Sequence, residues 1–87
     1  MVIAVEWDEI GRVNHYYSKI AVAVLKLSGS LNVGDQIRIV GPRTETAQLV
    51  KSMQVDHKSI EQANSGDLVG LKVKDKVREG DAVYKLP

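Results

Sequence analysis

Apolar and polar residues alternate with a period of two along most of the chain, and short apolar runs recur between turn signals. Helical periodicity is almost absent. The pattern predicts six strands, at residues 10–16, 20–27, 36–40, 46–55, 68–73 and 82–86. Turns are expected at 29–30, 41–42, 65–66 and 79–80. Only residues 59–63 predict a turn of helix, because Ser59 and Gln62 are spaced like a weak capping box.

Six short strands in 87 residues would leave costly open edges unless the sheet curls and closes. The pattern therefore predicts an all-β fold, a small closed or nearly closed β-barrel of six or seven strands. The chain has two prolines and no low-complexity run, so we expect a single domain over residues 1–87.

The predicted strand at 20–27 is apolar on both faces. Ile20, Val22 and Val24 lie on one face, and the other carries Ala21, Ala23, Leu25 and Leu27. A small barrel buries one face of such a strand, so the second face needs a cover. Either the N-terminal segment with Trp7 folds over it, or another protein does. The candidate protein interface consists of Ile20, Val22, Val24 and Trp7, with coverage of a barrel edge as the other role for Trp7.

A Gly-Asp pair precedes three of the predicted strands and contributes Asp35, Asp67 and Asp81. Three matching carboxylates raise the alternative of a dispersed catalytic site. Glycine, however, accepts the positive φ that ends a tight turn, and aspartate accepts hydrogen bonds from nearby backbone N–H groups. The pattern favours turns over catalysis.

Composition narrows the chemistry further. The net charge of +1 gives no overall attraction to nucleic acid or to an anionic membrane. The absence of cysteine excludes thiol catalysis and cysteine-ligated zinc, and the two histidines, His15 and His57, are too few for the usual four-ligand site. We expect no catalytic residue, no cofactor, no metal and no enzyme activity. No apolar run is long enough to span a bilayer and the first residues do not resemble a secretory signal, so a cytoplasmic protein without membrane contact is expected.

One local basic patch is a candidate for phosphate binding. In the stretch "KVKDKVR", inward-pointing Val69, Leu71 and Val73 would place Lys72 and Lys74 outward, and Lys76 and Arg78 extend the stripe. The alternative is an ordinary solvated strand face, interrupted by acidic residues.

A second candidate lies in "NHYYSK", where Tyr16 and Tyr17 could stack on unpaired bases. The alternative is that both tyrosines cap one end of the barrel with their hydroxyl groups in water.

The order of these elements carries a resemblance. "GSLNVGDQIRIVG", "VKSMQVDHKSIEQANSGDLVGLKV" and "VREGDAV" together resemble the second, β-barrel domain of translational GTPases such as elongation factor Tu, over residues 10–86. More narrowly, the chain resembles stand-alone elongation factor-like proteins. The resemblance implies a barrel of that domain type and a binding module associated with tRNA, ribosomal RNA or the ribosome. Leu68 stands where that family has an asparagine that helps receive aminoacyl-tRNA.

The stretch "GPRTETAQLVKSMQ" is also similar to the C-terminal barrel of collagenase-like peptidases. That similarity implies the alternative function, a protein-interaction module or a detached accessory domain of an enzyme. In either case the phosphate loop G-x-x-x-x-G-K-[ST] is missing, so we expect no binding of GTP or another nucleotide.

Overall fold

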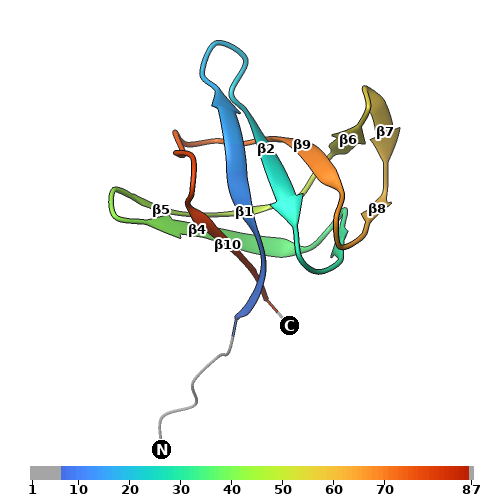
Figure 1. Ribbon diagram of the computed structural model, residues 1–87, viewed down its shortest axis with the longest axis horizontal. Helices are drawn as coiled ribbons and strands as arrows, with labels where there is room; N and C mark the ends of the chain where they lie inside the picture. Colours follow the sequence, from blue (N-terminus) through green and yellow to red (C-terminus); the bar gives the residue numbers. More distant parts are fainter. Residues whose placement is uncertain (1–6, 87) are drawn as a thin grey trace, which may run out of the picture.

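The computed structural model describes residues 7–86, and all regular structure in that range is β (Figure 1). The ten strands are β1 (Asp8–Tyr17), β2 (Val22–Leu27), β3 (Leu31–Asn32), β4 (Gln36–Gly41), β5 (Thr44–Leu49), β6 (Met53–Val55), β7 (Lys58–Ile60), β8 (Gln62–Ala63), β9 (Leu68–Lys72) and β10 (Ala82–Lys85). The prediction of an all-β fold is confirmed.

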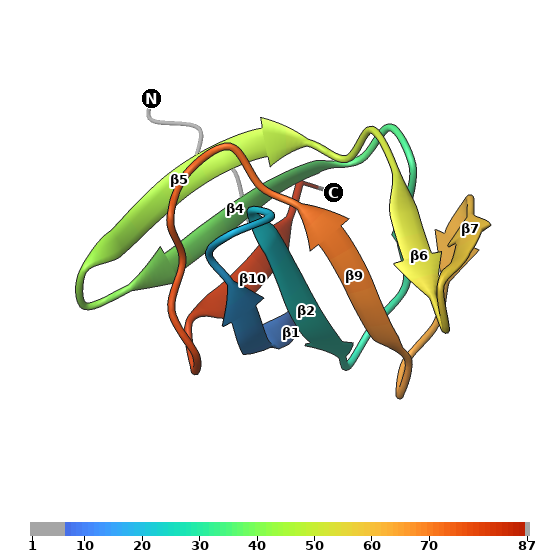
Figure 2. The same ribbon diagram turned by 90° about the horizontal axis from the view of Figure 1, so that it is seen from above.

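Eight strands form one antiparallel sheet in the order β5-β4-β10-β1-β2-β9-β6-β7, and β3 pairs with β8 in a separate two-stranded sheet. The large sheet curls strongly, so that β5 and β4 lie across from β2 and β9 (Figure 2). Its two end strands, β5 and β7, do not pair, and within residues 7–86 no sheet is closed. The expected closed barrel of six or seven strands is therefore corrected to an open, curled sheet, and the described residues form ten strands in all.

The curl begins in β1, the longest strand. β1 pairs with β10 through residues 8–12 and with β2 through residues 11–17, and its register shifts once in each ladder. Such bulges bend a strand and increase its twist. Gly11 pairs in both ladders, and a Cβ atom there would overlap the backbone carbonyl oxygen of Lys26. Glycine therefore allows β1 and β2 to approach closely at the bend.

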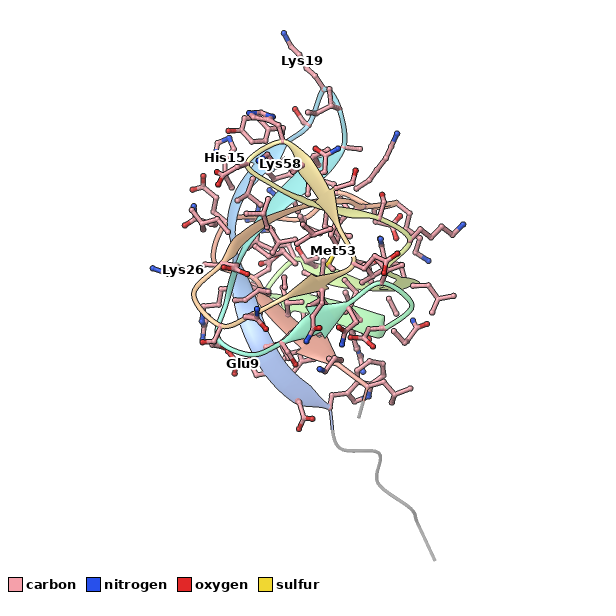
Figure 3. The ribbon with its side chains drawn as sticks, turned by 90° about the vertical axis from the view of Figure 1, so that its right-hand side faces the viewer. Glu9, His15, Lys19, Lys26, Met53 and Lys58 are labelled. Atoms are coloured by element: carbon pink, nitrogen blue, oxygen red, sulfur yellow. The ribbon has the colours of Figure 1, made fainter. Side chains whose placement is uncertain are left out.

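The core follows from the alternation of apolar residues. In β2 and β9, every second side chain is buried, and Met53 of the neighbouring strand β6 is buried with them (Figure 3). The most deeply buried large side chains are Leu25, Leu31, Ile37, Ile39, Met53, Leu71, Val50, Val69, Val77 and Val83. They are almost all aliphatic, as expected for a chain without phenylalanine. The inward direction predicted for Val69, Leu71 and Val73 is confirmed.

Side chains of β5, rather than a backbone ladder, connect this edge strand to the segment after β9. The Gln48 side-chain amide donates to the carbonyl oxygen of Lys72 at 2.9 Å and accepts from the backbone N–H of Lys74 at 3.0 Å. The Thr46 hydroxyl donates to the Asp75 carboxylate at 2.6 Å. These three bonds hold the open side of the curled sheet together. We call this region, between β5 and residues 72–75, the seam.

The three Gly-Asp pairs are turns, as predicted. The carboxylates of Asp35, Asp67 and Asp81 accept hydrogen bonds, 2.8–2.9 Å long, from the backbone N–H groups of Asn32, Asn64 and Arg78 respectively. In each turn the aspartate N–H donates back to the carbonyl oxygen of that same residue, and the preceding glycine has a φ between 88° and 97°. Glycine at that position is what a type II turn requires.

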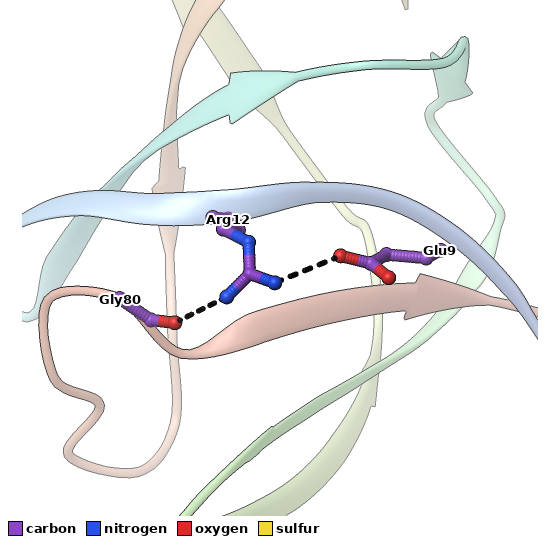
Figure 4. Close-up of polar contacts among 3 residues, drawn as sticks. All are labelled: Glu9, Arg12 and Gly80. Atoms are coloured by element: carbon purple, nitrogen blue, oxygen red, sulfur yellow. Dashed lines mark hydrogen bonds and ion pairs between the residues drawn. The ribbon is translucent and has the colours of Figure 1, made fainter.

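Arg12 ties β1 to the third of these turns. Its guanidinium donates to the carbonyl oxygen of Gly80 at 3.1 Å and lies 3.6 Å from the Glu9 carboxylate (Figure 4). All three groups are exposed or at the surface, so the ion pair contributes little, about 0–1 kcal/mol. Its main effect is to orient the turn.

Two local predictions are wrong. Residues 59–63 form no helical turn but parts of β7 and β8, because Lys58–Ile60 pair with β6 and Gln62–Ala63 pair with β3. The predicted strand at 46–55 is interrupted at Val50, whose N–H donates to the carbonyl oxygen of Asp35 and whose carbonyl oxygen accepts from Gly34. Pairing with distant segments overrides the local pattern at Gln62–Ala63 and at Val50, and a tight hairpin with β6 does so at Lys58–Ile60.

Candidate functional site

The outer face of β2 borders an apolar groove. Its volume is about 400 Å³, and it is lined by Tyr17, Ile20, Val22, Val24, Gln54, Asp56, His57, Leu68 and Gly70. Three of these side chains are large, apolar in whole or part, and substantially exposed: Ile20 is 60% exposed, Tyr17 50% and Leu68 49%. Three of the four residues predicted as a protein interface, Ile20, Val22 and Val24, thus lie together.

The register of three strands explains why these residues meet. Val22 lies between Tyr17 of β1 and Lys72 of β9, and Val24 lies between His15 and Gly70. Residues directly opposite in antiparallel strands project from the same face of the sheet. The inward neighbours Ala23 and Leu25 are completely buried, so the inner face predicted for β2 is in the core, while Val22 and Val24 stay half-buried on the outer face.

Gly70 leaves the floor of the groove open. A Cβ atom at this position would lie 3.7 Å from the carbonyl oxygen of Gln54 and 3.8 Å from a methyl group of Val22, which are ordinary contact distances. Neither crowding nor a positive φ therefore requires glycine here. The missing side chain instead makes room between Val24 and Gln54.

Two tight turns form the walls. Asp56 and His57 join β6 to β7 with φ values of 51° and 63°, the combination of a type I′ hairpin turn. Ala21, at the end of the β1–β2 hairpin, has a φ of 54°, and its carbonyl oxygen accepts from the backbone N–H of Val73. Left-handed conformations are uncommon outside glycine and cost free energy. Both walls are thus held in unfavourable local geometry beside the groove.

Trp7 does not belong to the groove. It lines a separate hollow with Arg38, Val40 and Tyr84, on the outer side of β4 and β10. Because β1 runs between Trp7 and the groove, Trp7 cannot be the cover predicted for the outer face of β2. Residues 1–6, also considered as a cover, lie outside the described residues.

Of the residues predicted to bind nucleic acid, the two tyrosines lie on different faces of β1. Lys72, Lys74, Lys76 and Arg78 are exposed, separated by buried Val73 and Val77. Tyr17 is exposed and its ring centroid lies 4.3 Å from that of His15, but Tyr16 packs against the core on the opposite face. The two tyrosines therefore do not provide a joint stacking platform, and RNA binding by the basic residues stays a prediction.

Sequence reasoning missed Leu68, Gly70 and the Asp56–His57 turn as parts of the groove. The alternation in β9 could have indicated Leu68 and Gly70. Because Val69 and Leu71 point inward, Leu68 and Gly70 lie on the outer face with Val22 and Val24. The turn carried no such signal, because its position depends on the pairing of β6 with β9.

Among residues 7–86 no three His, Cys, Asp or Glu side chains gather closely enough to hold a metal ion. His15 contacts Glu79 at 2.9 Å on the surface, and His57 lies exposed in its turn. That described part of the chain also contains no helix long and apolar enough to cross a membrane.

Comparison with known proteins bears directly on the two families suggested by the sequence. No protein-family model matches the chain. It is 48% identical over 79 residues to a protein named as an uncharacterized protease of Methanocaldococcus jannaschii, an alignment covering 90% of this chain and 19% of that protein. It is 35% identical over 78 residues to a collagenase of Porphyromonas gingivalis, covering 87% of this chain and 22% of the collagenase. The chain spans about a fifth of the length of these relatives.

The fold comparison agrees. The C-terminal domain of a protein described as a U32 peptidase of Geobacillus thermoleovorans superposes with a TM-score of 0.86, covering 92% of this chain and 93% of that domain, at 18% sequence identity. The chain is built like a peptidase C-terminal domain. These findings support the alternative function predicted from "GPRTETAQLVKSMQ", a detached accessory domain.

The resemblance to translation factors is corrected accordingly. The relatives are named as a protease and collagenases, and the structural neighbour is a peptidase domain, so an elongation factor-like or ribosome-associated role is withdrawn. The expectation of no enzyme activity also needs refinement, since the chain corresponds to a small part of proteins named for catalysis.

Proposed function

We propose that this chain works as a non-catalytic accessory domain of a collagenase-like peptidase, and that its apolar groove packs against the catalytic part of such a protein. Its relatives are about four to five times as long, so the matching segment has much more protein to contact. The cytoplasmic location expected from the sequence stays a prediction that cell fractionation would test.

The groove is the observation that carries the proposal. Ile20, Tyr17 and Leu68 surround one hollow and are each about half or more exposed to water, and Val22 and Val24 form its floor. Water contact with apolar surface costs about 25 cal/mol per Å² relative to burial. A cluster of this kind beside a fixed sheet is typical of an interface with another protein domain.

The experiment supplies the accessory domain separately from the enzyme. A shortened form of the Methanocaldococcus relative, lacking the 79 matching residues, is mixed with this chain and binding is measured by calorimetry. We expect association with a negative heat-capacity change, because apolar surface is buried. Failure of the two proteins to associate would overturn the proposed docking.

Matched variants locate the interface. Val24→Asp places a charge on the groove floor and should weaken binding at least tenfold. Val33→Asp makes the same change at an exposed position in the Asn32–Asp35 turn, outside the groove, and should leave binding unchanged. Equal effects of the two variants would place the interface elsewhere.

The non-catalytic part of the proposal has its own test. The purified chain, incubated alone with gelatin or casein, should release no peptides. Cleavage that persists through purification and is abolished by a substitution in this chain would show that it carries catalytic residues itself.

A further inference from the structure

A second hollow lies at the seam, between the end of β5 and the end of β9. It has a volume of about 590 Å³ and is lined by Gln48, Leu49, Lys51, Ser52, Lys72, Val73 and Lys74. It shares no lining residue with the apolar groove. We call it the lysine hollow.

The charged side chains that line the lysine hollow are all positive. Lys51, Lys72 and Lys74 line it without any acidic side chain. The ion pairs found within residues 7–86 use Arg12, His15 and Arg38, so these lysines are not neutralised by a partner there. The nearest acid in sequence, Asp75, accepts the hydroxyl hydrogen bond of Thr46. The hollow is therefore complementary to an anionic ligand.

Its geometry is fixed by the protein. The Gln48 side chain binds the backbone on both sides of Val73, which is 3% exposed, and so holds this short segment against β5. With Val73 pointing inward, Lys72 and Lys74 project outward together. Lys51 approaches from the connection that follows β5. The lysines come from two segments held together before any ligand arrives, which lowers the cost of binding.

The remaining lining favours a polypeptide over a nucleic acid. Leu49 is 51% exposed, and the residues around the hollow include no aromatic side chain. Single-stranded nucleic acids are held by base stacking on aromatic rings in addition to basic residues. Leucine instead suits an aliphatic side chain, and lysine suits carboxylates.

We propose that the lysine hollow binds an acidic stretch of polypeptide, with at least two carboxylates paired to Lys51, Lys72 and Lys74 and an aliphatic side chain against Leu49. This interaction is separate from the docking of the apolar groove and adds to it. Lys72 lies beside Val22 in register, so one large partner can contact both surfaces.

The test uses the full chain and a fluorescent peptide of alternating glutamate and leucine, with a glutamine-and-leucine peptide as the uncharged probe. Anisotropy should show binding of the acidic peptide that weakens as salt is raised from 50 to 200 mM, and at least tenfold weaker binding of the uncharged peptide. Equal affinity for the two peptides, or no binding of the acidic one, would overturn the proposal.

Two triple variants with the same change in charge provide the site control. Replacing Lys51, Lys72 and Lys74 by glutamine should weaken peptide binding at least tenfold. Replacing Lys19, Lys26 and Lys58 by glutamine removes three exposed lysines elsewhere (Figure 3) and should weaken it less than threefold. Similar losses of affinity in both variants would mean that net charge alone attracts the peptide. That result would overturn the proposal that the lysine hollow is a specific binding site. Circular dichroism establishes that each variant is folded.

Two further measurements separate this proposal from its rivals. A uridine oligonucleotide that binds more tightly than the acidic peptide, and is lost with Lys51, Lys72 and Lys74, would overturn the peptide in favour of RNA. Val24→Asp should leave peptide binding intact even where it abolishes docking to the shortened peptidase. Failure of one proposal therefore leaves the other standing.

Discussion

The carboxylate of Asp81 occupies the space that a side chain on Gly41 would need. A Cβ atom built on Gly41 would overlap both the Oδ1 and the Cγ atoms of Asp81, which is only 3% exposed. The backbone at the end of β4 therefore packs directly against the Asp81 carboxylate in the turn before β10. Glycine at position 41 is a steric requirement, unrelated to a positive φ.

Gly41→Ala should consequently destabilise the protein by about 1–3 kcal/mol through overpacking, measured by urea unfolding. Gly70→Ala, where a Cβ meets only ordinary contacts, serves as the control and should stay within about 0.5 kcal/mol of the original. In Gly41→Ala/Asp81→Ala the clash is absent, so the double variant should lose less than the sum of the single losses. Additive losses would contradict the contact.

Removal of the turn carboxylates should lower stability without affecting any binding activity. Asp35→Ala, Asp67→Ala and Asp81→Ala each lose a hydrogen bond to a backbone N–H group and should cost about 0.5–2 kcal/mol. The bond of Asp67 is exposed and that of Asp81 part-buried, so Asp81 should cost more. Asp8→Ala, at an exposed strand position, is the control. Unchanged stability in all three variants would reopen the question of a carboxylate site.

Gln48→Ala should loosen the seam. The variant removes the bond to the Lys72 carbonyl oxygen and the bond from the Lys74 N–H, at a cost of about 1 kcal/mol for each bond. The sharper readout is hydrogen exchange, in which the amide of Lys74 should exchange faster while that of Leu25 in the core does not. Gln54→Ala, an exposed glutamine of β6, should leave the Lys74 amide unchanged. Unaltered protection of Lys74 in Gln48→Ala would show that another contact holds the seam.

His57→Gly should stabilise the protein. At a φ of 63° the backbone is sterically unfavourable for histidine, which has a Cβ atom, but not for glycine. The free energy of unfolding, measured by heat or urea, should therefore rise by about 1 kcal/mol. Ser59→Gly, in the middle of β7, should instead destabilise, because glycine weakens a strand interior. A loss of stability in His57→Gly would mean that the imidazole makes a contact worth more than the strain.

Local signals were sufficient for much of the fold. Alternation placed Val69 and Leu71 inward, and Gly-Asp pairs located three turns, because both effects act within a few residues. The strand at Gln62–Ala63 could not be found in this way, since its partner is the distant strand Leu31–Asn32. The strand at Lys58–Ile60 carries no alternation of apolar residues and forms through its hairpin with Met53–Val55. Short segments of this kind acquire their structure from pairing rather than propensity.

The candidate site was predictable only in part. Val22 and Val24 belong to one strand, so their common face follows from the period of two, whereas Ile20 lies in the turn before that strand and still lines the groove. Trp7 was assigned to the same surface because its place depends on the path of a strongly bent β1, which the sequence pattern does not encode. The sequence did not predict that Lys51 and Lys72 line the same hollow. The segments that carry them are brought together at the seam by side-chain hydrogen bonds of Gln48 and Thr46.

The seam is also where the described fold can open locally most easily. Elsewhere, neighbouring strands are held by backbone ladders, whereas β5 is joined to residues 72–75 by the side chains of Gln48 and Thr46. Opening at this line breaks fewer bonds than opening between any two long strands, so it should be among the first local fluctuations of the described fold. A peptide that contacts Lys51 on one side and Lys72 on the other would hold the two sides of the seam together. Binding and rigidity would then rise together, and the occupied hollow would stiffen the same strand β9 that carries part of the apolar groove.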